Sequence, residues 1–403
     1  MHLRVLAIAS LIALAGCHLQ GDPPGEAPSG VAVEPGDGRV TVTWNQEPGL
    51  TYWIFYQPGS SVVAAAPGVS IIFGAVSPHV VSNLANGTQY AFVMNATKDD
   101  SSAGPSSAVV VATPRLAGAS WVSGTALGST LQNLNGIAFS GTRLVAVGDS
   151  GTVFAGAYNY TSIDPPGVTA WTTPTSFPAV TTNLTAVTHS GQFVALSTDG
   201  SILTSPDGLT WTSATGSILS TGMNGIAFGA GVYVAVGDGG SIFTSTDLVT
   251  WTPAAFSTAN NLFNVSFLNG GFVATGAGGT LLTSTNGSSW TVQDSKTTNA
   301  LRGAAFRSTP TAVYVVVGDA GTIVTSTDGT TWNPIAPPLS PNLSGVIFGS
   351  RFVAVGQGGA VAYSDDGTSW SLTSAGSADL ARVIFTPAMY VAVGAAGANA
   401  IAK

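Results

Sequence analysis

Six tryptophans recur along the chain at intervals of 38 to 42 residues, and this spacing constrains the fold more than any other feature of the sequence. They are Trp171, Trp211, Trp251, Trp290, Trp332 and Trp370. Short apolar runs of strand length fill each interval. A fixed period of about 40 residues made of short strands is typical of a β-propeller, in which each period forms one four-stranded blade. We therefore expect an all-β repeat domain over residues 116–403.

Each period has the same internal order. An apolar strand such as Gly225–Phe228 comes first, a second strand such as Tyr233–Val236 follows, and a Gly-rich turn leads to the third strand and the tryptophan strand. The first strands start near seven residues: Asn135, Thr185, Asn224, Phe263, Arg302, Ser344 and Ala381. The last unit ends before a tryptophan strand, whereas Trp121 precedes the first full repeat. We expect Trp121 to supply the outer strand of the last blade, which would close a seven-bladed ring without long exposed edges.

A turn of the form Ser-x-Asp/Asn-Gly-x-x-Trp precedes most of these tryptophans. Its residues are Ser205, Asp207, Gly208 and Trp211; Ser245, Asp247 and Trp251, with Leu248 in place of glycine; Ser284, Asn286, Gly287 and Trp290; Ser326, Asp328, Gly329 and Trp332; and Ser364, Asp366, Gly367 and Trp370. The turn resembles the Asp-box (BNR) repeat of sialidase-like propellers, although it is typically one residue shorter. This resemblance implies that the aspartates stabilise the turns and that the tryptophans pack between blades; binding of calcium or another ligand is the alternative.

The N-terminus predicts export and lipidation. Met1–Arg4 is basic and Val5–Leu14 is apolar, but this run is shorter than the about 20 residues that span a bilayer, so it is typical of a secretory signal. Leu14–Cys17 resembles the lipobox of bacterial lipoproteins, which implies a signal peptide over residues 1–17 and acylation of Cys17, the single cysteine. The resemblance implies a lipid-anchored protein of the bacterial cell envelope, and His18 after the cysteine favours the outer membrane, facing either the periplasm or the outside.

A second β domain is expected between the anchor and the repeats. Residues 18–29 are rich in Pro and Gly and are expected to form a tether. Val40, Val42 and Trp44 alternate with polar residues, as in a half-buried strand. The segment from Leu84 to Tyr90 resembles the tyrosine corner of β-sandwich domains. Residues 30–115 accordingly resemble a fibronectin type III domain.

The composition excludes several functions. Charged residues make up only 7% of the chain and the net charge is −8, which excludes a basic surface for nucleic acid. All the glutamates precede residue 48, so the Tyr/Glu nucleophile pair of sialidases cannot form in the repeats. His189 is the single histidine there and is expected in a surface turn, which excludes a histidine metal cluster or a Ser-His-Asp triad. We expect no metal site and no cofactor.

Two sets of polar residues remain as candidates for function. Four aspartates recur in the Gly-rich turns and are expected to stabilise them, with cation binding, sugar binding or catalysis as alternatives: Asp149, Asp199, Asp238 and Asp319. Five residues at the starts of first strands are expected to line one mouth of the central channel, where they either hold a carboxylate, a sugar or a partner side chain or are simply solvated: Asn135, Asn224, Asn264, Arg302 and Arg382.

The sequence therefore favours a non-catalytic binding or scaffold protein with a protein or glycan partner. The alternative is a glycan-active hydrolase of the Asp-box propeller type, which would need two carboxylates flanking the scissile bond. Two close carboxylates in one pocket would favour the enzyme. A channel mouth that carries amides, hydroxyls and arginines would favour the binding protein.

Overall fold

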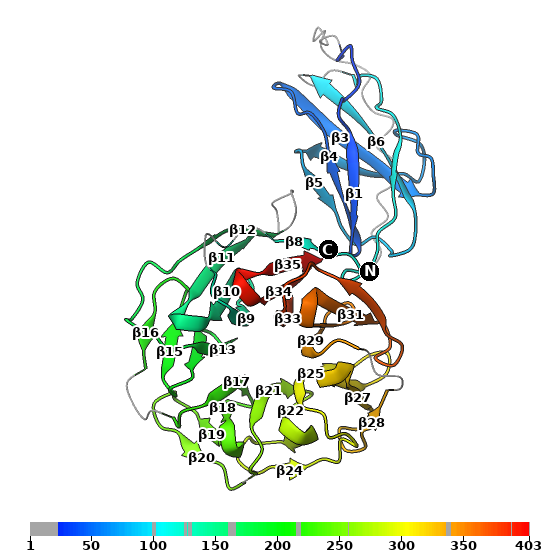
Figure 1. Ribbon diagram of the computed structural model, residues 1–403. Helices are drawn as coiled ribbons and strands as arrows, with labels where there is room; N and C mark the ends of the chain where they lie inside the picture. Colours follow the sequence, from blue (N-terminus) through cyan, green and yellow to red (C-terminus); the bar gives the residue numbers. More distant parts are fainter. Residues whose placement is uncertain are drawn as a thin grey trace. The chain divides into compact units, whose positions relative to one another are not determined.

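The computed structural model describes residues 23–98, 102–124, 127, 131–159, 167–214, 219–256, 258–335, 340–387 and 389–402. Every long element is a β-strand, so the predicted all-β class is confirmed (Figure 1). Contacts separate two compact units: one comprises residues up to Pro35 and Val40–Thr113, and the other comprises Gly36–Arg39 and Pro114–Lys403. None of the described elements is a helix with the length and apolar character needed to cross a bilayer. Cys17 and its lipobox lie outside the described residues, as does Ser162–Asp164, the counterpart of the Ser-x-Asp turn before Trp171.

The first unit consists of two antiparallel sheets. One has the order β1 (Ala32–Gly36), β2 (Arg39–Thr43) and β5 (His79–Val81). The other has the order β4 (Ser70–Ala75), β3 (Leu50–Pro58), β6 (Tyr90–Lys98) and β7 (Val110–Ala112). Val40, Val42 and Trp44 belong to its buried core, as their alternation predicts. The hydroxyl of Tyr90 accepts the N–H of Ala85 at 3.1 Å.

The second unit contains seven four-stranded antiparallel sheets in the part of the chain that the structure describes, and we number them in chain order. Sheet 1 is β9 (Leu134–Phe139), β10 (Arg143–Gly148), β11 (Val153–Asn159) and β12 (Gly167–Thr172). Sheet 2 is β13 (Leu184–His189), β14 (Phe193–Ser197), β15 (Ile202–Ser205) and β16 (Thr212–Ser213). Sheet 3 is β17 (Met223–Gly229), β18 (Val232–Gly237), β19 (Ile242–Ser245) and β20 (Thr252–Pro253). Sheet 4 is β21 (Leu262–Leu268), β22 (Gly271–Gly276), β23 (Leu281–Ser284) and β24 (Thr291–Val292).

The remaining sheets continue the series. Sheet 5 is β25 (Leu301–Arg307), β26 (Val313–Gly318), β27 (Ile323–Ser326) and β28 (Asn333–Pro334). Sheet 6 is β29 (Leu343–Phe348), β30 (Phe352–Gly356), β31 (Ala360–Ser364) and β32 (Ser371–Ser374). Sheet 7 is β33 (Leu380–Phe385), β34 (Tyr390–Gly394) and β35 (Asn399–Ala402), with β8 (Val122–Ser123) as its fourth strand. In six of the sheets a short 3₁₀ turn follows the second strand: Asp149–Gly151, Asp238–Gly240, Ala277–Gly279, Asp319–Gly321, Gln357–Gly359 and Ala395–Gly397.

The first strands of the sheets surround a common centre, and the propeller predicted from the 40-residue period is confirmed (Figure 1). Each first strand contacts the first strand of the next sheet, and β33 contacts β9. Small residues allow this approach, because a Cβ on Gly225 would lie 3.2 Å from the Cα of Asn264 in the next sheet. A β-bulge near the start of every first strand leaves one residue out of the pairing. These residues are Asn135, Thr185, Asn224, Phe263, Arg302, Ser344 and Ala381.

One hydrogen bond recurs between neighbouring sheets. The residue just before a first strand accepts, through its side-chain oxygen, the N–H of the middle residue of the preceding sheet's 3₁₀ turn. The pairs are Asn183 with Ser150, Asn261 with Gly239, Asn342 with Ala320 and Asp379 with Gly358. Asn133 of sheet 1 makes the same bond, at 3.1 Å, to Ala396 of sheet 7. The bond therefore recurs where the two ends of the repeat region meet.

The tryptophans fill the spaces between sheets. Trp332 is 1% exposed and packs with Val273 of sheet 4 and Val316 of sheet 5. Trp121 lies just before β8, and its indole N–H donates to the carbonyl of Gly118, three residues earlier, at 2.8 Å. Trp211 makes the same bond to Gly208 at 3.0 Å. The Gly118-x-x-Trp121 segment thus repeats the geometry of the later turns, although its sequence keeps only the glycine and the tryptophan.

His189 is not in a surface turn, so that expectation is wrong. It is the last residue of β13, is half-buried, and its ring meets Phe193 edge-on at 4.8 Å between centroids. In sheet 3 the equivalent pair is Phe228 and Tyr233, at 4.6 Å. His189 therefore occupies a phenylalanine position of the repeat, and burial lowers the pKa of its imidazole.

Candidate functional site

The Ser-x-Asp-Gly turns share one set of hydrogen bonds. In sheet 2, Ser205 Oγ accepts the N–H of Gly208 at 2.8 Å, and Asp207 Oδ1 accepts the N–H groups of Leu209 and Thr210, both at 2.8 Å. The indole N–H of Trp211 then donates to the Gly208 carbonyl. The same bonds are present in four further turns, with residues Ser245, Asp247 and Trp251; Ser284, Asn286, Gly287 and Trp290; Ser326, Asp328, Gly329 and Trp332; and Ser364, Asp366, Gly367 and Trp370.

In these turns the side-chain oxygen of the aspartate or asparagine accepts hydrogen bonds from N–H groups of the same turn. The N–H groups of Thr331 and Thr330 hold the pKa of Asp328 well below its usual range, because they stabilise the ionised carboxylate. Asn286, which carries no charge, makes the same two bonds in sheet 4. Nowhere among the described residues do three or more His, Cys, Asp or Glu side chains form a group that could hold a metal ion.

The four aspartates of the Gly-rich turns are each held by neighbouring groups. Asp149 accepts the amides of Asn133 and Asn135 at 2.9 and 2.8 Å. Asp238 accepts the amide of Asn224 at 2.9 Å. The other two are Asp199, which accepts the N–H of Ser201 at 2.9 Å, and Asp319, which pairs with Arg302. Each lies in a different sheet, so none of these turns carries the two carboxylates that glycoside hydrolysis uses.

The five candidate channel-mouth residues occupy two different positions. Asn135, Asn224 and Arg302 are bulged residues. Asn264 and Arg382 instead follow the bulge by one residue, in the place that Gly225 has in sheet 3, so the five residues expected together at one mouth of the channel do not occupy equivalent positions. The bulge is the physical reason, since one unpaired residue turns the next side chain to another side.

Arg302 is neutralised within its own sheet. Its Nε and one NH2 nitrogen donate to the two carboxylate oxygens of Asp319, at 2.5 and 2.9 Å. The guanidinium also lies over the ring of Phe263, 4.9 Å from its centroid, which adds a cation–π contact. Asn264 donates to the hydroxyl of Ser266 at 3.0 Å.

Arg382 has no such counter-charge. One terminal nitrogen donates to the carbonyl oxygens of Ser344, at 3.0 Å, and Ala381, at 2.9 Å. Among the described residues no carboxylate lies within ion-pair distance of its guanidinium. Burial, and to a lesser extent the nearby positive charge of Arg302, lower the pKa of Arg382 to about 10. The first strands of sheets 6 and 7 thus hold a half-buried cation that donates to backbone carbonyls.

Comparisons with known proteins support the fold. No family model matches the chain, and no curated protein matches it. Among solved structures, the chain is similar to YCF48 bound to D1 peptide, at 18% identity over 70% of this chain and 96% of that one, with a TM-score of 0.55. The chain is also similar to YCF48 from Cyanidioschyzon merolae, at 18% identity over 70% of this chain and 98% of that one, with a TM-score of 0.54. For the WD40 β-propeller domain of Doa1 the identity is 11% over 70% of this chain and 97% of that one, with a TM-score of 0.56. At these identities the likeness shows the propeller fold alone.

Proposed function

We propose that this chain is a non-catalytic binding or scaffold protein of the bacterial cell envelope, whose propeller binds a ligand carboxylate at the channel mouth. The observation that carries the proposal is Arg382, a half-buried guanidinium without a carboxylate within ion-pair distance among the described residues. A cation with few water neighbours gains more from a carboxylate than one that is fully exposed. A carboxylate from a ligand would form charge-assisted hydrogen bonds with the remaining guanidinium N–H groups.

A binding role also agrees with the acidic residues of the propeller. Asp149, Asp238 and Asp319 each accept hydrogen bonds from amide or guanidinium groups of their own sheet. The aspartates of the proposed Asp-box turns accept backbone N–H groups. A glycan hydrolase would instead need one carboxyl group with a raised pKa beside a second carboxylate.

The architecture that we propose has three parts. The seven four-stranded sheets are the seven blades of the ring, and pairing of Val122 with Ile401 closes it. Residues 30–115 form a fibronectin type III domain. The three-stranded and four-stranded sheets of the first unit support this assignment, as does the bond from Ala85 N–H to the Tyr90 hydroxyl. Residues 1–17 are a lipoprotein signal and residues 18–29 a tether.

Lipidation of Cys17 would place the protein at the membrane, and we propose the outer membrane. Stable anchoring by lipid needs more than one acyl chain, which a lipidated N-terminal cysteine would supply. The Cys17→Ser variant is expected in the soluble fraction, whereas the parent stays with the membrane after a salt wash. Retention of the variant in the washed membrane would contradict the lipid anchor.

The partner that we propose is a peptide with an accessible carboxylate. The solved structure of YCF48, which shares the propeller fold, is bound to a D1 peptide. The test is fluorescence anisotropy on the full chain carrying Cys17→Ser, with a library of labelled peptides ending either in a free carboxylate or in an amide. We expect a preference for the free carboxylate, and a loss of about tenfold or more in affinity for Arg382→Gln, because a hydrogen bond to a charged group is removed.

Lys296→Gln is the matched control. It also removes one positive charge, but from an exposed side chain of the segment after β24. Its affinity for the peptides should equal that of the parent. Equal binding of the carboxylate and amide peptides, or unchanged binding by Arg382→Gln, would contradict the proposed function.

A further inference from the structure

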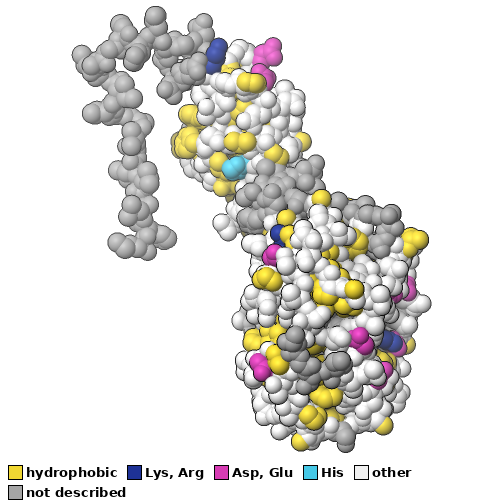
Figure 2. All heavy atoms as spheres, turned by 90° about the vertical axis from the view of Figure 1, so that its left-hand side faces the viewer, with side chains coloured by type: hydrophobic (Ala, Val, Ile, Leu, Met, Phe, Trp, Pro, Cys, Tyr) yellow, Lys and Arg dark blue, Asp and Glu magenta, His cyan; other side chains and the backbone are white. Residues whose placement is uncertain are grey.

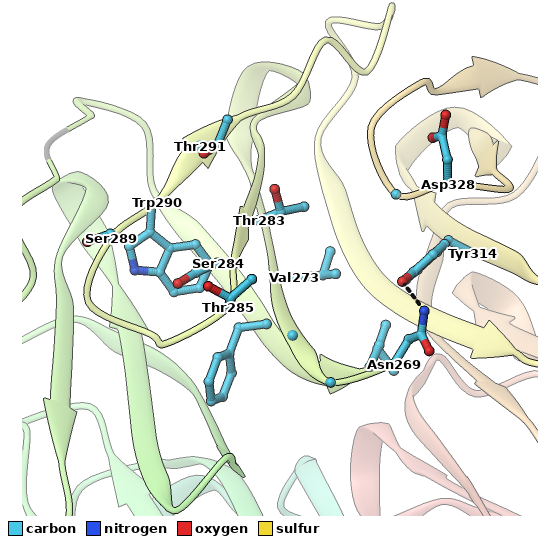
Figure 3. A pocket seen from close by; sticks show the side chains of 15 residues that line it. Asn269, Val273, Thr283, Ser284, Thr285, Ser289, Trp290, Thr291, Tyr314 and Asp328 are labelled. Carbon is cyan, nitrogen blue, oxygen red and sulfur yellow. Dashed lines mark hydrogen bonds between the residues drawn. The ribbon is translucent and has the colours of Figure 1, made fainter.

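A groove of 410 Å³ lies between sheets 4 and 5, away from the channel-mouth residue Arg382 of sheet 7. Its lining includes Asn269, Thr283, Trp290 and Tyr314. Figure 3 shows Trp290 and Tyr314 on opposite sides of this space, with Thr283 between them. We call it the sheet 4–5 groove. Its volume is within the roughly 300–1,000 Å³ of small-molecule sites.

The groove exists because one position lacks a side chain. Gly271 begins the second strand of sheet 4, where sheets 1 and 5 have Arg143 and Val313. In those sheets the side chain fills the gap to the turn glycine of the next sheet. A Cβ on Gly208 would lie 3.1 Å from Arg143 Cδ, and one on Gly367 would lie 3.0 Å from Val313 Cγ1.

The turn glycine opposite Gly271 has no such neighbour. The three atoms nearest to a Cβ on Gly329 all belong to Tyr314, which is in the same sheet as Gly329. Trp290 also borders this space, and its indole is partly exposed, as is that of Trp370. Trp211 and Trp332 are only 2% and 1% exposed. An aromatic ring is therefore accessible beside the space that Gly271 leaves.

The walls of the groove are polar but nearly uncharged. The hydroxyls of Thr283, Thr285, Ser289 and Thr291 line it, and the Tyr314 hydroxyl accepts the amide of Asn269 at 2.8 Å. Tyr314 thus keeps its own O–H proton for another acceptor. The indole N–H of Trp290 is bonded to Gly287, so the ring is fixed in orientation. Asp328 is the charged residue of the lining, and its negative charge disfavours an anion.

We propose that the sheet 4–5 groove binds a neutral sugar. A pyranose ring presents apolar C–H groups on its faces and hydroxyls around its edge, each of which donates and accepts hydrogen bonds. The groove matches both features, with the partly exposed ring of Trp290 for the C–H groups, and the Tyr314 hydroxyl together with the other hydroxyl and amide groups for the edge. This site is independent of the carboxylate site at Arg382.

The central variant is Gly271→Val, which places in sheet 4 the residue that stands at the equivalent positions 232 and 313. The backbone of Gly271 is outside the left-handed region, and the nearest atom to an added Cβ is the Ser284 carbonyl oxygen at 3.1 Å. The variant should therefore fold. Arg143→Ala is the matched control, since it changes the equivalent position in sheet 1, which contributes no residue to the groove.

The measurement is saturation-transfer NMR on the full chain carrying Cys17→Ser. The probes are glucose, galactose, mannose, N-acetylglucosamine and glucuronate, each titrated into the protein. We expect at least one of the four neutral sugars to bind the parent and Arg143→Ala equally, and Gly271→Val to bind it at least tenfold more weakly while melting at a similar temperature. Arg382→Gln should bind the sugar as the parent does. The test of sugar binding in the groove is therefore separate from the test of carboxylate binding at Arg382.

A second variant tests the same proposal in case Gly271→Val does not fold. Tyr314→Phe keeps the aromatic ring and removes the hydroxyl, and we expect a loss of about fivefold in affinity for the sugar. The proposal is overturned if no neutral sugar binds the parent, if glucuronate binds more tightly than the neutral sugars, or if a folded Gly271→Val binds as tightly as the parent. Unchanged sugar binding by Tyr314→Phe would also overturn it.

Discussion

At the scale of single residues, the repeated turn requires an acceptor oxygen and not a charge. Asn286 accepts the N–H groups of Ser288 and Ser289 at 3.0 and 2.9 Å, much as Asp328 accepts those of Thr330 and Thr331 at 2.8 and 2.7 Å. The two residue types differ in titration alone. An aspartate makes the turn sensitive to acid, whereas an asparagine does not.

Asp328→Asn should therefore reduce acid sensitivity. The turn N–H groups lower the pKa of Asp328 in the folded state, below the value of about 3.9 in the unfolded chain. Its contribution to stability is then complete above about pH 3.9 and is lost as the pH falls below that value. Urea midpoints of the variant and the parent should be similar at pH 7, and the variant should gain relative to the parent at pH 3. The same pH dependence in both proteins would argue against this role.

Substitutions at the middle residue of a 3₁₀ turn can test whether its backbone is strained. Ala396 has a φ of 51°, which an L-residue adopts at a cost of about 1–2 kcal/mol, and its side chain is exposed. Ala396→Gly should raise stability by about 1 kcal/mol, because glycine relieves this strain while its N–H still donates to Asn133. The neighbouring Ala395→Gly should lower stability by about 0.5–1 kcal/mol, since Ala395 is outside the positive-φ region. Thermal unfolding that shifts in the same direction for both variants would contradict the explanation.

At the scale of elements, the buried tryptophans should contribute more to stability than the polar groups of their turns. Trp332→Ala is expected to cost roughly 3–5 kcal/mol, as for other buried large side chains. Trp290→Ala should cost less, because that indole is partly exposed. Asp328→Ala removes hydrogen bonds from an exposed turn and should also cost less than Trp332→Ala. Denaturant midpoints give the order, and a larger loss for Asp328→Ala would point to cation binding at the turn.

The strands and sheets could be predicted from the sequence because the patterns that indicate them are local. The 40-residue spacing of Trp211, Trp251 and their equivalents indicates the sheets, and apolar runs mark the first two strands. The bulge was not readable, since pairing register depends on contacts with the next strand, and so Asn264 and Arg382 were assigned to the wrong position. His189 was misplaced for a similar reason, because its role as a substitute for phenylalanine depends on its contact with Phe193.

The candidate site was predicted less well than the fold. Arg302 and Arg382 were identified from their place in the repeat, but the pairing of Arg302 with Asp319 and the absence of a partner for Arg382 depend on three-dimensional contacts. The sheet 4–5 groove has a sequence signal that was missed. Gly271 stands where other repeats have a larger residue, and an alignment of the repeats would have shown it.

At the scale of the whole propeller, stability depends on joining the two ends of the repeat region. β8 pairs with β35, and Met389 and Val391 of the last repeat pack with Leu134 of sheet 1. Truncation after Ala375 removes β33–β35 and should destabilise the propeller well beyond the lost residues, because it exposes strand edges and apolar faces on both sides of the gap. The melting temperature of the truncated chain, compared with the full chain, tests this. Equal melting temperatures would mean that the ring does not depend on its last sheet.

The pairing of Val122 with Ile401 also determines when the ring can close, because its two strands are far apart in the sequence. β8 is synthesised before all the other described propeller strands, whereas its partner β35 is synthesised after the rest of them. At about 5–20 residues per second, synthesis of the intervening segment takes roughly 15–60 s. During that interval six sheets can form, but the ring stays open with its apolar faces accessible. The repeat region is therefore most exposed to proteases and to aggregation until β35 has emerged and pairs with β8.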